Sequence, residues 1–131
     1  MAWIWVLAAA INGVLAVAAG AAASHFFAHD PRDFAWLTTG AQYAMFHALA
    51  LLALAALAGR SGRAAERFLA AACWLFIAGT VLFSGSLYVL ALTGPGPLLW
   101  LTPFGGIAFM LGWATLGVYA WIAWRRGQAA P

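Results

Sequence analysis

The sequence predicts an all-α integral membrane protein built as a bundle of four transmembrane helices. Apolar residues make up 66% of the 131 residues and charged residues only 7%, whereas soluble domains typically carry about 25% charged residues. The apolar residues gather in four long runs separated by short segments rich in glycine, proline, arginine or aspartate. Because little chain remains outside these runs, we expect one integral membrane domain over residues 1–131.

Each apolar run is long enough to cross a bilayer as a helix. The runs cover residues 3–23, 38–58, 68–92 and 104–124. At about 1.5 Å per residue, each spans a hydrocarbon core about 30 Å thick. Long runs without alternation of polar and apolar residues are helices rather than barrel strands. The first run exceeds the apolar region of a signal peptide and has no basic residue before it, so we interpret it as a retained span.

The segment before the second run carries a helix-start pattern. Asp30 suits the N-cap, Pro31 the first helical position and Asp33 the first turn. We therefore expect the second helix to begin near Pro31, outside the hydrocarbon. The segments at 59–67 and 93–97 interrupt the chain with polar residues, glycine and proline.

The arginines predict the orientation. The first loop holds one arginine and the third loop none, whereas the second loop region and the C-terminal tail hold five: Arg60, Arg63, Arg67, Arg125 and Arg126. The positive-inside rule then predicts cytoplasmic termini. So few arginines beside apolar spans suit anionic lipid headgroups, with Arg60, Arg63 and Arg67 as the candidate contacts, and do not suggest binding to nucleic acid.

Two helices carry stripes of small residues. The first helix has Gly13, Ala16, Gly20 and Ala23, and the fourth has Gly105, Ala108, Gly112 and Thr115. Small residues let helix backbones approach closely in a membrane. We favour packing within the bundle as their role, with an oligomer contact as the alternative.

Polar residues inside the spans can be placed by depth, counting from the ends of each run. The predicted midplane layer contains Asn12, His47 and Thr80, and a layer about 7 Å nearer the outside contains Gln42, Ser84 and Ser86. Tyr43 shares a helix face with His47, and Ser84 and Tyr88 share a face with Thr80. We interpret the layers as interhelical hydrogen bonding, each bond contributing about 0.6–2 kcal/mol. The alternative is a ligand site or proton path.

The three histidines do not predict a metal or haem centre. His25 and His29 belong to the outer interface, and about 16 Å of depth separates His25 from His47. That separation is too large for two axial ligands of one haem. We therefore expect no metal, no cofactor and no catalytic residue.

Three blocks of the sequence resemble a known family. QYAMFHALALL (42–52), LFSGSLYVLALTG (82–94) and TPFGGIAFMLGW (102–113) are similar to blocks of the YgdD-like family, small inner-membrane proteins catalogued as domain of unknown function 423. The segment GAAASH (20–25) keeps Gly20, Ala23 and His25 of the family's GAFGAH-like block but lacks a phenylalanine and a glycine.

The resemblance implies a four-helix, multi-pass protein of the inner (plasma) membrane and supplies no reaction. It directs attention to polar positions within the matching blocks: His25, Gln42, His47, Ser84, Ser86 and Thr102. We expect a non-enzymatic accessory or assembly protein, acting as a homo-oligomer or within a larger membrane complex. The alternatives are a small transporter or channel with a polar path near Gln42 and His47, and a haem- or quinone-binding redox protein.

Overall fold

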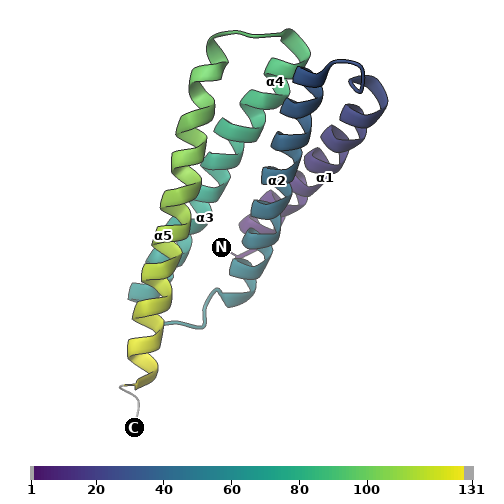
Figure 1. Cartoon of the computed structure of the whole chain (residues 1–131). Helices are drawn as coiled ribbons and strands as arrows, with labels where there is room; N and C mark the ends of the chain where they lie inside the picture. The colour runs from purple at the N-terminus through teal and green to yellow at the C-terminus, as the bar shows by residue number, and fades with distance from the viewer. Residues whose placement is uncertain (1, 129–131) are drawn as a thin grey trace.

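Four long antiparallel helices make up the computed structural model, which describes residues 2–128 (Figure 1). They are Ala2–Phe26 (α1), Pro31–Leu57 (α2), Arg63–Thr93 and Pro97–Gln128. The third consists of α3 (Arg63–Thr80), the π-helical segment η1 (Val81–Gly85) and α4 (Ser86–Thr93); the fourth consists of the 3-10 turn η2 (Pro97–Trp100) and α5 (Leu101–Gln128). All four are long and apolar enough to span a membrane, which confirms the predicted helical class. Each helix begins before its predicted run, and all but α2, which ends at Leu57, also end after it.

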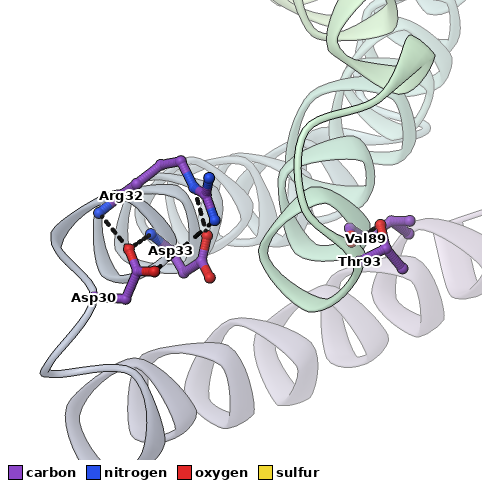
Figure 2. A network of polar contacts seen from close by, with 5 residues as sticks. All are labelled: Asp30, Arg32, Asp33, Val89 and Thr93. Carbon is purple, nitrogen blue, oxygen red and sulfur yellow. Dashed lines mark hydrogen bonds and ion pairs between the residues drawn. The ribbon is translucent and has the colours of Figure 1, made fainter.

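The N-terminus of α2 has the predicted cap. Asp30 Oδ1 accepts hydrogen bonds from the backbone amides of Arg32 at 3.0 Å and Asp33 at 3.2 Å. Arg32 Nε in turn donates to Asp33 Oδ1 at 2.9 Å, as Figure 2 shows. The hydrogen bond from the Asp33 amide is the main cause that lowers the pKa of the Asp30 carboxyl, assisted by the Arg32 amide and the Arg32 charge and opposed by desolvation. The helix therefore begins outside the apolar run, with its first amides satisfied.

The helices are arranged around a central pair. The pair consists of α2 and the third long helix, because α2 packs against α3, η1 and α4. α1 covers one side of the pair by packing on α2, and α5 covers the other by packing on α3 and η1. The main apolar core lies toward the end that carries the α2–α3 loop, and its fully buried side chains include Leu51, Leu69 and Phe76. A smaller core around Ala23 and Leu37 joins α1, α2 and α4 at the opposite end. α2 therefore contributes to two separate apolar cores, one toward each end of the bundle.

The two stripes of small residues differ in their packing. On α5, Gly105, Ala108 and Gly112 are all buried, and a Cβ on Gly112 would lie 2.5 Å from the Phe76 ring. The α5 stripe therefore packs within the bundle. On α1, Ala16 and Ala23 are buried, whereas nothing lies within 4 Å of the Cβ position of Gly13 or Gly20.

The α2–α3 loop and the end of α5 meet at one end of the bundle (Figure 1). Ser61 Oγ and Tyr119 Oη are 2.8 Å apart, and the Arg126 guanidinium lies beside Gly62. The Ser61 amide of the loop also donates a hydrogen bond to Glu66 Oε1, in the first turn of α3, at 3.1 Å. These contacts bring the arginines of the second loop region and of the C-terminal segment to the same end.

Candidate polar sites on two sides of the central helices

Five of the seven polar residues predicted inside the spans lie in two separate places. One is the polar cavity, which lies between α1, α2 and η1 and is lined by Asn12, Leu15, Ala44, Thr80, Val81, Ser84, Gly85 and Tyr88. The other is the aromatic cluster, formed between α2, α3, η1 and α5 by Tyr43, His47, Phe76, Phe83, Phe109 and Trp113. The predicted midplane layer is thus divided, because His47 faces α5 while Asn12 and Thr80 face the cavity. Depth along a helix gives a height but no direction around the axis.

His47 is the centre of the aromatic cluster. Its side chain is buried, and its ring stacks on Phe109 with the centroids 3.6 Å apart and the planes within 7°. Tyr43 flanks both rings at longer range. A groove of about 350 Å³ lies beside His47, and its walls include Phe83, Phe109 and Trp113. Burial against aromatic faces fixes the orientation of the imidazole.

Both nitrogens of His47 have partners that determine the tautomer. Nδ1 lies 2.8 Å from the carbonyl oxygen of Tyr43, and Nε2 lies 3.3 Å from the indole nitrogen of Trp113. A carbonyl only accepts and an indole only donates. Nδ1–H must therefore donate to Tyr43 while Nε2 accepts from Trp113, so the geometry requires the neutral imidazole. Trp113 was not singled out from the sequence, since a tryptophan in an apolar span gives no sign of its donor role.

The polar cavity has a volume of about 170 Å³. Within the described residues, three buried side-chain polar atoms lack a hydrogen-bond partner, and two of them, Ser84 Oγ and Tyr88 Oη, belong to the cavity lining. Thr80 differs, because its hydroxyl donates to the Phe76 carbonyl at 2.9 Å. Buried polar groups are normally paired. The cavity therefore gathers two of the three unpaired buried polar atoms, the third being Trp5 Nε1 outside its lining.

The π-helical segment explains how Ser84 reaches the cavity unpaired. Five other helical hydroxyls donate to the carbonyl four residues earlier: those of Ser24, Thr38, Thr80, Thr93 and Thr115. Ser84 makes no such bond although it is fully buried. It lies within η1, where the backbone is wider than in an α-helix. π-Helical turns often occur at functional sites, and the sequence contained no signal for this one.

The remaining predicted residues have separate surroundings. Ser86 Oγ donates to the Phe83 carbonyl at 2.9 Å and lies 2.7 Å from Thr102 Oγ1, which links α4 to α5. Gln42 does not join Ser84 and Ser86 in an outer layer, because its side chain is exposed on α2 and has no hydrogen bond within the described residues.

The predicted interfacial residues all lie at the surface. His25 is in the last turn of α1, which ends at Phe26, and His29 lies in the turn that follows; both histidines are exposed. Arg60, Arg63 and Arg67 are exposed as well. Residues 2–128 contain no group of three or more histidine, cysteine or acidic side chains placed to hold a metal ion.

Comparison with known proteins agrees with the resemblance seen in the sequence. A family model described as "Protein of unknown function (DUF423)" matches residues 19–106. The chain is 40% identical over 121 residues to the UPF0382 inner membrane protein YgdD of Escherichia coli (strain K12), covering 91% of this chain and 90% of the relative. A UPF0382 membrane protein of Haemophilus influenzae is 40% identical over 109 residues, covering 82% and 85%.

The UPF0382 membrane protein YwdK of Bacillus subtilis (strain 168) is likewise 40% identical, over 120 residues that cover 89% of this chain and 95% of the relative. No solved structure matches the chain. The relatives' names and the four membrane-length helices identify a multi-pass protein of the inner membrane. The chain therefore belongs to the DUF423 family, whose members are proteins of unknown function.

Proposed function

We propose that the protein is a non-enzymatic assembly or accessory protein of the membrane, and that it acts as a homodimer formed through the exposed face of α2. The observation that carries the proposal is Gln42, an amide in an apolar span whose side chain is exposed and has no partner within the described residues. An unpaired amide facing lipid is unfavourable, whereas an amide between two membrane helices stabilises their contact.

The residues around Gln42 form one continuous helix face. Counting on from Gln42 in alternating steps of four and three residues gives four more positions on this face, all exposed: Phe46, Leu49, Ala53 and Ala56. This is the spacing of a helix–helix seam. Gln42 is the polar position within it, and a single polar residue on such a seam fixes register and partner.

A second copy is the partner that suits this face best. A twofold axis along the membrane normal places Gln42 of both copies at the same depth. Each amide then offers its NH₂ to the carbonyl oxygen of the other, since a glutamine side chain is both donor and acceptor. Such a reciprocal pair needs no further polar group from either chain.

Cross-linking in native membranes tests the proposal. Cys73 is the only cysteine and is fully buried, so Phe46→Cys introduces the one reactive thiol on the α2 face. We expect Phe46→Cys to form a covalent dimer, and Met110→Cys, at an exposed position on α5, to form none. Adding Gln42→Leu to Phe46→Cys should weaken dimerisation about 5- to 20-fold, as expected from losing about 1–2 kcal/mol of polar contact.

Three results would overturn the proposal. Equal cross-linking of both cysteine variants would show that the α2 face has no special role. An unchanged dimer with Gln42→Leu would remove the amide from the interface. Cross-linking of Phe46→Cys only to a different protein would replace the homodimer by a larger complex.

The environment of His47 supports a structural role in the same framework. Both of its nitrogens are engaged inside the bundle, so proton transfer would first require breaking one of these bonds.

We also propose that both termini are cytoplasmic, because five of the six arginines then lie on the cytoplasmic side. Reporter fusions to the C-terminus and to the 94–96 turn test this orientation; an active periplasmic reporter at the C-terminus would reverse it.

A further inference from the structure

We infer that the polar cavity binds a small apolar molecule that carries a ring carbonyl, of the kind found in the head of a lipid quinone. The inference is separate from the proposed dimer, because Ala44 faces the cavity whereas Gln42 lies on the exposed face of the same helix.

The two unpaired hydroxyls define the polar part of the ligand. Ser84 Oγ and Tyr88 Oη are both buried without a partner, and each carries a proton that needs an acceptor. An unpaired buried donor is costly, whereas unused lone pairs are tolerated better. A carbonyl oxygen has two lone pairs and no proton, so it accepts from one hydroxyl or from both. Asn12, which also lines the cavity, adds an amide.

The size and lining define the apolar part. The volume of about 170 Å³ is close to that of the engineered apolar cavity of about 150 Å³ that admits benzene. Leu15, Ala44 and Val81 supply apolar walls. A single substituted six-membered ring satisfies both the volume and the walls, whereas a cluster of waters would leave the apolar walls without matching contacts.

The opening of the cavity indicates where the ligand comes from. Leu15 and Val81 line the cavity and are themselves 49% and 65% exposed. The cavity therefore opens between α1 and η1 onto the surface that lipid covers. A molecule dissolved in the bilayer has direct access, and a water-soluble metabolite does not.

Duroquinone and durene form a matched pair of probes. Both are tetramethylated six-membered rings, but only duroquinone carries carbonyls, and its full substitution prevents addition to the Cys73 thiol. The protein is reconstituted in lipid nanodiscs with ¹³C-labelled alanine methyl groups. The Ala44 methyl, which faces the cavity, reports binding by its NMR chemical shift as each probe is titrated.

We expect duroquinone to shift the Ala44 signal and to bind at least 5-fold more tightly than durene. Removing both hydroxyls with Ser84→Ala and Tyr88→Phe should weaken duroquinone binding about 5- to 100-fold, the range for losing two hydrogen bonds, and leave durene binding unchanged. Because neither hydroxyl has a hydrogen-bond partner in the bundle, neither substitution should unfold the protein. Ser86→Ala is the control, since its hydroxyl is engaged outside the cavity.

Equal affinities for the two probes, or an unchanged duroquinone affinity in the double variant, would overturn the inference. No shift at Ala44 with either probe would also overturn it and would leave the cavity to water. None of these results bears on cross-linking of Phe46→Cys, so the cavity and the proposed dimer can fail independently.

Discussion

A methyl group added at Gly105 tests the close approach of α5 to the backbone of η1. A Cβ built on Gly105 lies 2.7 Å from Phe83 Cβ and 2.8 Å from Phe83 Cα, and closest to the Phe83 backbone nitrogen. Carbon atoms in favourable contact are about 3.5–4.0 Å apart. Because backbone atoms cannot rotate away as a side chain can, Gly105→Ala must push α5 and η1 apart by about 1 Å.

The expected cost follows from a comparison with the adjacent glycine. Overpacking of a well-packed core typically costs about 1–3 kcal/mol, and the better helix propensity of alanine offsets up to about 1 kcal/mol. At Gly106 the nearest atom to a built Cβ is Phe83 Cδ2 at 4.0 Å, an ordinary contact. The propensity gain is common to both positions and cancels in their difference. Gly105→Ala should therefore be about 1–3 kcal/mol less stable than Gly106→Ala.

Equilibrium unfolding in mixed micelles of lipid-like detergent and SDS measures this difference. Both variants are compared with the parent chain under identical conditions, with helix content as the readout. We expect Gly106→Ala to unfold at or above the SDS fraction of the parent and Gly105→Ala at a lower one. Equal stability of the two variants within about 0.5 kcal/mol would refute the close approach of α5 to η1.

Two further perturbations address the aromatic cluster and the α2 cap. Trp113→Phe removes the donor to His47 Nε2 and should lower the free energy of unfolding by about 1–3 kcal/mol, because the buried acceptor loses its partner. The control Trp121→Phe, at an exposed position, should lower it by less than about 0.5 kcal/mol. Equal losses in the two variants would contradict the assigned hydrogen bond. The pKa of Asp30 is lowered in the folded state, so its cap is fully formed above the ordinary pKa of 3.8 and is lost as the pH falls through the lower folded value. The protection of the Arg32 and Asp33 amides from hydrogen exchange should therefore decrease on acidification below about pH 4. Asp30→Asn, an equally good cap, should show no such pH dependence. Unchanged protection in the parent chain would refute the cap.

The fold could be predicted from the sequence because membrane helices follow from composition and length. Four apolar runs, a cap at Asp30 and breaks at glycine and proline are local features, and the structure contains all of them. The apolar runs located element ends less well than the cap did: the run 38–58 begins several residues inside α2, whereas the cap pattern predicted a start near Pro31, where α2 begins. Amphipathic first turns lie outside the hydrocarbon and are not part of an apolar run.

The sites could be predicted only in part, because depth is one coordinate of two. Counting residues placed Asn12, His47 and Thr80 at similar heights, but the direction of each side chain depends on which helices are neighbours. Helix periodicity did better within one helix: Thr80, Ser84 and Tyr88 were expected on one face, and all three line the polar cavity. The π-helical turn could not be anticipated, since nothing in the sequence of residues 81–85 signals it; in the structure Phe83, within this turn, lies against Gly105 of α5.

The directions taken by neighbouring residues of α2 give this helix three separable roles. Gln42 points away from the bundle, where only another membrane helix can pair its amide. Tyr43 and His47 face α5, where the imidazole has no unused nitrogen. Ala44 faces the polar cavity, whose hydroxyls are unpaired. The unpaired amide and the unpaired hydroxyls therefore indicate two different unmet partners, a protein surface for the first and a carbonyl-bearing small molecule for the second.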